Sequence, residues 1–98
     1  MIIVIAENVV PAEKRAEYME ALDKSGIVKA TNEESGCISY DLSASSIYPD
    51  RVYVVERWEG MAQLQGHMKG ENFAALGKLN KSYVTDGKFN MYKAEEMK

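Results

Sequence analysis

The first predicted strand of this 98-residue chain carries apolar side chains on both of its faces. Residues 2–9 place Ile2, Val4 and Ala6 on one face and Ile3, Ile5 and Val9 on the other. Residues 51–58 repeat the pattern, with Val52, Val54 and Trp58 set against Tyr53 and Val55. An antiparallel sheet with one face in water should instead alternate apolar and polar residues. Both faces of the predicted sheet must therefore be covered.

The order of the predicted elements is β-α-β-β-α-β. A helix is expected from Pro11 to about Glu34, and a second helical region, in two pieces, from Gly60 to about Tyr83. The remaining strands are expected at residues 37–43 and 88–93, the latter after a turn at Asp86-Gly87. This order predicts an α+β, ferredoxin-like fold over residues 1–98, with a four-stranded antiparallel sheet and both helices on one face.

Helices can cover only one face of such a sheet, and a second copy of the chain is the simplest cover for the other. We therefore expect a homodimer that packs through its sheet faces. The net charge of -3 without a basic cluster argues against nucleic-acid binding, and no apolar run is long enough to cross a membrane. The single cysteine, Cys37, fits a reducing, cytoplasmic location. With one histidine and one cysteine, we expect no metal site.

The segment from Glu56 to Phe73 holds the leading catalytic candidates. His67 is the only histidine, and imidazole is the usual base for chemistry near neutral pH. The alternative is a half-buried helical histidine with a polar contact. Glu56 lies in a predicted strand between two apolar residues, where desolvation would raise the pKa of its carboxyl. The alternative is a carboxylate paired with a cation on a neighbouring strand.

Further residues are candidates for binding a substrate. Trp58 would stack against a planar ring or simply belong to the core. Asn8 would orient a substrate oxygen or cap the helix that follows Pro11. Tyr40 and Tyr53 are possible hydroxyl donors to an oxyanion. Cys37 is expected to be a small buried hydrophobe rather than a nucleophile.

Several marks along the chain carry a family likeness. They are Ile3-Val4-Ile5-Ala6-Glu7, Pro11, Glu34-Ser35-Gly36-Cys37 before Tyr40-Asp41-Leu42, and Glu56-Arg57-Trp58-Glu59 before Ala62, Leu64 and His67. In their order and spacing, the chain resembles the antibiotic biosynthesis monooxygenase family over nearly its whole length. The resemblance implies a dimeric α+β barrel of two ferredoxin-like subunits. It also implies oxidation of quinols, anthrones or related phenols by O₂ without a cofactor.

The sequence departs from the family pattern at Asn72, where many members have a second histidine before the phenylalanine that corresponds to Phe73. A haem-degrading branch of the family uses an asparagine, a tryptophan and a histidine. Asn8 matches the first, but the other two positions fall on His67 and Gly77. Haem iron needs an axial ligand, and Gly77 offers none there. The resemblance therefore indicates no haem.

The function predicted from the sequence is a cofactor-independent monooxygenase that acts on a quinol, an anthrone or a related phenol. His67, with Glu56 or Asn8, would move the proton, and Trp58, Tyr40, Tyr53, Asn72 and Phe73 would bind the substrate. Two alternatives stay open at this stage. The first is an isomerase or lyase of a small carbonyl compound, and the second is a ligand-binding stress-response dimer without turnover.

Overall fold

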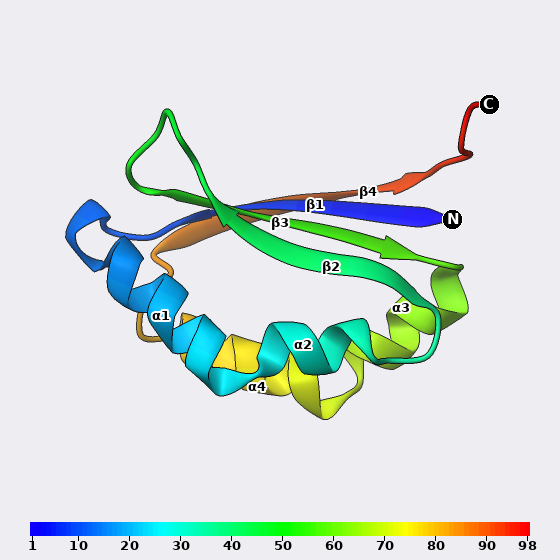
Figure 1. Ribbon diagram of the computed structural model, residues 1–98, viewed down its shortest axis with the longest axis horizontal. Coiled ribbons are helices and arrows are strands. Elements are labelled where there is room, and N and C mark those ends of the chain that lie inside the picture. The colour runs from blue at the N-terminus through cyan, green and yellow to red at the C-terminus, as the bar shows by residue number, and fades with distance from the viewer.

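The computed structural model describes residues 1–98. Its elements follow the order β1 (Ile2–Val9), η1 (Ala12–Lys14), α1 (Arg15–Ser25), α2 (Ile27–Asn32), β2 (Cys37–Ala44), β3 (Arg51–Trp58), α3 (Met61–Met68), α4 (Glu71–Asn80) and β4 (Asp86–Lys93). All strand pairs are antiparallel, and the sheet order is β2-β3-β1-β4. The helices lie together on one side of the sheet, and the other side is bare (Figure 1). The expected ferredoxin-like α+β fold is thus confirmed.

Two expected boundaries were wrong. The first helical region is broken at Gly26, whose φ of 73° ends α1 and begins α2. Glycine adopts this left-handed conformation without the steric cost that a side chain would add. The Asp86-Gly87 turn is absent, because both residues already belong to β4 and pair with Val9 and Asn8. The second helical region does consist of two pieces, α3 and α4, as expected.

The core lies between the sheet and the helices. Three of the helices bury pairs of residues three or four positions apart, which share one helical face: Tyr18 and Leu22 in α1, Ile27 and Thr31 in α2, and Leu64 and His67 in α3. The fourth, α4, buries Leu76. From the sheet, alternate residues of β1, β2 and β3 point toward them, namely Ile2, Val4, Tyr40, Leu42, Val52, Val54 and Trp58. None of the helices is long and apolar enough to cross a membrane.

The bare face of the sheet carries the second apolar set seen in the sequence. Ile5 and Val55 are paired across β1 and β3 and are both exposed, as is Tyr92 on the neighbouring strand β4. An ion pair of 2.8 Å between Arg51 and Glu7 borders this apolar patch. The double apolarity of β1 and β3 is therefore real, but within one chain only the helix side is covered.

Candidate functional site

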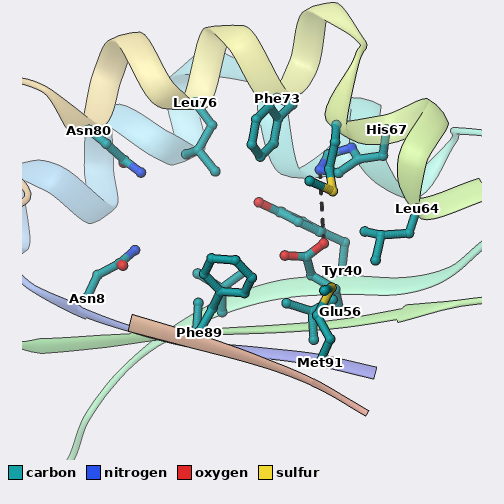
Figure 2. A pocket seen from close by; sticks show the side chains of 14 residues that line it. Asn8, Tyr40, Glu56, Leu64, His67, Phe73, Leu76, Asn80, Phe89 and Met91 are labelled. Carbon is teal, nitrogen blue, oxygen red and sulfur yellow. Dashed lines mark ion pairs between the residues drawn. The ribbon is translucent and has the colours of Figure 1, made fainter. Parts of the chain in front are cut away.

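A cavity of about 250 Å³ lies between the sheet and the helices α3 and α4. Its lining is mainly apolar and comes from both layers, including Val4, Ala6, Val54, Leu64, Leu76 and Phe89 (Figure 2). Phe89 of β4 is 61% exposed, and Phe73 of α4 is 44% exposed. These exposed aromatic rings lie where β4 faces α4, so the cavity opens at this side of the molecule. A mainly apolar pocket with few polar groups is typical of a small-molecule site.

Glu56 supplies a carboxylate at one end of this cavity. The indole Nε1–H of Trp58 donates a hydrogen bond of 3.0 Å to its Oε1. Its Oε2 has no hydrogen-bond partner in the protein, and Figure 2 shows the carboxylate directed toward the cavity. Burial raises the pKa of Glu56, although the Trp58 hydrogen bond and the charge of His67 act in the opposite direction. A carboxylate of this kind has the proton affinity that a general base needs.

His67 lies beside Glu56 and is almost completely buried, at 3% exposure. Its Nε2 is 4.0 Å from Oε1 of Glu56, and its Nδ1 is 3.0 and 3.1 Å from the two carboxylate oxygens of Glu34. The ring packs against Trp58 and Phe73, with centroid distances of 4.8 and 5.5 Å. Aromatic packing and the Glu34 contact together fix the orientation of the imidazole. Each of its two ring nitrogens therefore faces a carboxylate, with only the Glu34 contact at hydrogen-bonding distance.

The residue that sequence reasoning missed is Glu34, in the loop between α2 and β2. Besides contacting His67, its Oε2 accepts a hydrogen bond of 3.0 Å from the side-chain amide of Asn72. The only local signal is its position before Gly36, whose φ of 77° makes the turn into β2. No periodicity marks a loop carboxylate, so only the tertiary structure shows that Glu34 and His67 meet.

Tyr40 directs a hydroxyl into the cavity from β2 (Figure 2). The residue is buried, and its hydroxyl makes no hydrogen bond within the protein. Burial, followed by the nearby charge of Glu56, raises the pKa of Tyr40, so the hydroxyl keeps its proton near neutral pH. Both backbone groups of Tyr40 bond to the side chain of Asn32, at 2.8 and 3.0 Å. A rigidly held donor without a partner is well placed to bind a ligand oxygen.

The other end of the cavity carries two asparagines, Asn8 of β1 and Asn80 of α4 (Figure 2). Asn80 accepts a hydrogen bond of 2.7 Å from the Tyr18 hydroxyl. Asn8 makes no cap to the helix after Pro11, and it lines the cavity instead. Its Oδ1 lies close to Gly87, where an added Cβ would come within 2.8 Å of it. The cavity thus has polar groups at both ends and apolar walls between them.

The structure brings five of the predicted site residues together around the cavity: Asn8, Tyr40, Glu56, His67 and Phe73. The other three lie elsewhere. Trp58 is fully buried behind Glu56, Asn72 bonds to Glu34 outside the cavity, and Tyr53 lies on the bare face of the sheet, paired with Glu7. Trp58 and Asn72 therefore support groups near the cavity, whereas Tyr53 is separated from it by the sheet.

Cys37 and the acidic residues around it form no metal site. No three side chains of His, Cys, Asp or Glu gather in a way that could hold a metal ion. Burial, and then the nearby charges of Glu34 and Glu56, raise the pKa of the Cys37 thiol. A thiol that keeps its proton is a poor nucleophile. The titratable groups that line the cavity are the Glu56 carboxylate, the His67 imidazole and the Tyr40 hydroxyl.

Comparison with known structures places this arrangement among proteins of the same fold. A conserved protein from Methanosarcina mazei Go1 is similar, with a TM-score of 0.84 and 28% identity over 96% of this chain and 92% of that one. An antibiotic biosynthesis monooxygenase gives a TM-score of 0.83 and 26% identity over 98% of this chain and 100% of that one. A candidate antibiotic biosynthesis monooxygenase from Deinococcus radiodurans gives a TM-score of 0.79 and 29% identity, over 99% of this chain and 95% of that one.

A comparison with curated proteins finds no match. The family model for antibiotic biosynthesis monooxygenases, in contrast, matches residues 1–78. This range includes β1, β2, β3 and all of the helices except the last two residues of α4, and thus Glu34, Glu56 and His67. The expected family is thereby confirmed, and the chain belongs to the antibiotic biosynthesis monooxygenase family.

Proposed function

We propose that this protein is a monooxygenase that oxidises a small phenolic substrate, a quinol or an anthrone, with O₂ and without metal or flavin. The observation that carries the proposal is the Glu56 carboxylate, which presents an unpartnered oxygen to an apolar cavity beside His67. Cofactor-free reduction of O₂ requires an electron-rich substrate anion, and a base in a desolvated site can generate that anion.

The reaction balances without a further oxidant or reductant. Glu56 accepts the hydroxyl proton of the substrate, and the resulting anion gives one electron to O₂. Recombination of the substrate radical with superoxide forms a carbon–oxygen bond, and protonation gives a hydroperoxide. Loss of water then leaves the carbonyl product. For a quinol, one O₂ yields a hydroxyquinone and one water, so one oxygen atom enters each.

The cavity favours a flat, compact substrate. Its volume of about 250 Å³ lies just below the range for drug-sized ligands, roughly 300–1,000 Å³, which suits a flat system of up to three fused rings such as an anthrone. Tyr40 can donate a hydrogen bond to one ring oxygen, while Asn8 faces the other end. Apolar walls would bury the ring faces between them. Substrates with oxygen at opposite ends of a ring system therefore fit best.

An isomerase or lyase of a phosphorylated or strongly anionic carbonyl compound has less support. Such a substrate needs cations, but no lysine or arginine lines the cavity. Arg51 is paired with Glu7, and Arg57 donates to Ser39 at 2.7 Å, both on the bare face of the sheet. A neutral carbonyl substrate would still be compatible with the Glu56 and His67 pair. Reaction without O₂ would indicate that alternative.

We also propose that the bare face of the sheet is the contact of a homodimer. Ile5 and Val55 are 41% and 42% exposed at its centre, and Tyr92 lies exposed on β4. Exposed apolar side chains grouped on one face mark interaction surfaces. In sedimentation velocity at micromolar concentration, the wild type should be a dimer and Ile5→Asp a monomer. A monomeric wild type would refute this proposal.

The function is tested by O₂ uptake with a panel of quinols and anthrones. The wild type should consume O₂ faster than buffer with at least one substrate, and Glu56→Gln and His67→Ala should each lower kcat by roughly 10²-fold or more. Glu59→Gln is the matched control, because this carboxylate is exposed on the loop after β3. If no substrate reacts, or if the two variants behave like the control, the protein is not the proposed enzyme. Binding of the panel without turnover would favour the ligand-binding alternative.

A further inference from the structure

His67 separates two hollows of the molecule. On one side is the apolar cavity that contains Glu56, and on the other is a surface groove lined by Glu34, Ser35, Ala62, Gln63 and Gly66. His67 is the one residue that lines both hollows. Its ring thus forms part of the wall between the site of the proposed chemistry and solvent.

We propose that Glu56, His67 and Glu34 form a proton relay between the cavity and the surface groove. In this relay Glu34 is the outer member, which acts through His67 and never touches the substrate. The relay rests on the proposed function, because it serves a reaction that first removes a proton from the substrate and later consumes protons to form water.

The two ring nitrogens face different carboxylates. Nδ1 lies 3.0 Å from Oε2 of Glu34. Nε2 lies 4.0 Å from Oε1 of Glu56, the pair that Figure 2 marks with a dashed line. A neutral imidazole carries a proton on one nitrogen and accepts one on the other, so it can pass a proton from one side to the other. The 4.0 Å gap exceeds hydrogen-bonding distance. Transfer there requires Glu56 to approach by about 1 Å, or one bridging water.

Each transfer breaks one bond to hydrogen and forms the next. The substrate hydroxyl protonates Glu56, Glu56 protonates Nε2, and the imidazolium releases its Nδ1 proton to Glu34 and then to water in the groove. This leaves the imidazole protonated on Nε2. When the peroxide intermediate needs protons, the sequence runs inward through Glu34 and Nδ1, and the ring returns to its starting tautomer. No electrons move through the relay.

The surroundings of Glu34 suit this role. Asn72 holds its Oε2 with a neutral amide donor, which orients the carboxylate but cannot take up its proton. A histidine at this position would compete for that proton. The other titratable groups near the relay are Tyr40 and Cys37, and burial raises the pKa of both, so they keep their protons near pH 7. The proton path is therefore confined to Glu56, His67 and Glu34.

The first test needs no substrate. Because His67 is the only histidine, ¹⁵N-histidine labelling gives one imidazole signal set in NMR. The neutral ring of the wild type should be the Nδ1–H tautomer. Glu34→Ala removes the acceptor and should lose this preference, while Glu33→Ala, at an exposed neighbour, should keep it. An Nε2–H tautomer in the wild type, or no effect of Glu34→Ala, would overturn the relay. Glu34→Leu, which also lacks an acceptor, replaces Glu34→Ala if that variant does not fold.

The second test uses a substrate that supports O₂ uptake. Glu34→Ala should lower kcat by about 10- to 100-fold with KM within twofold, and added formate should restore kcat as it enters the groove. Glu33→Ala should match the wild type. A raised KM at unchanged kcat, or no rescue by formate, would show that Glu34 only holds the structure together. If no substrate reacts, the proposed function fails, but the NMR test still decides whether Glu34 controls the proton on His67.

Discussion

Asn32 takes the place of a neighbouring strand at the edge of the sheet. Its side chain accepts a hydrogen bond of 3.0 Å from the Tyr40 N–H and donates one of 2.8 Å to the Tyr40 carbonyl. Asn32→Ala removes both, and each is worth about 0.5–1.5 kcal/mol. We therefore expect a loss of about 2 kcal/mol in the free energy of unfolding, which corresponds to about 10 °C in Tm for a chain of this size.

Urea unfolding of Asn32→Ala measures this loss. Lys29→Ala is the matched control, because Lys29 is exposed on the same helix α2 and its side chain makes no hydrogen bond or ion pair; its effect should stay within about 0.5 kcal/mol. The KM of Asn32→Ala should also rise, since the Tyr40 hydroxyl would lose its fixed position. If Asn32→Ala unfolds at the same urea concentration as Lys29→Ala, the Asn32 side chain does not hold β2 in place.

Three further predictions follow from individual residues. Burial raises the pKa of Glu56, so the folded protein binds this proton more tightly than the unfolded chain does. The contribution of Glu56 to stability therefore falls as the pH rises above the ordinary carboxyl value. In urea titrations, the stability of Glu56→Gln relative to wild type should increase from pH 4 to pH 7.5, and a decrease would contradict this. Gly36→Ala should lower the free energy of unfolding by about 2 kcal/mol, because the new side chain is strained in the left-handed conformation and clashes with Gln63. Gly26→Ala, with open space around it, adds the strain alone and should lose only about 1 kcal/mol. Equal losses would show that the Gln63 contact is unimportant. Tyr40→Phe should raise KM about tenfold, because it removes one hydrogen bond to the substrate. Tyr53→Phe, on the bare face of the sheet, should leave KM unchanged. A raised KM for Tyr53→Phe alone would place the substrate on the other side of the sheet.

Much of the fold follows from local sequence patterns. The β-branched run of β1 and the alternation of β2 predict strands because side chains in a strand point to opposite faces. The break at Gly26 was missed, since a single glycine inside an Ala-, Glu- and Lys-rich segment also occurs in continuous helices. Gly87 suggested a turn, but in the structure it belongs to β4. There its lack of a side chain leaves room for the side chain of Asn8 on the neighbouring strand.

The candidate site was predictable only in part. His67 and Glu56 stand out because one is the single histidine and the other interrupts an apolar strand. The contact between His67 and Glu34 was not predictable, because these two residues are 33 positions apart and meet only when the loop after α2 packs against α3. Asn72 appeared as a missing histidine in the sequence, but in the structure it is a hydrogen-bond donor to Glu34. Tyr53 and Tyr40 look alike in sequence, and only the strand register separates their faces.

Turnover under ¹⁸O₂ shows most directly whether the cavity of Glu56 and His67 inserts an oxygen atom from O₂ into a phenolic substrate. The product is analysed by mass spectrometry, and O₂ consumption is measured in parallel. We expect one ¹⁸O atom in each product molecule, one O₂ consumed per turnover and no accumulation of hydrogen peroxide. Product without ¹⁸O, or one hydrogen peroxide formed per product, would contradict it.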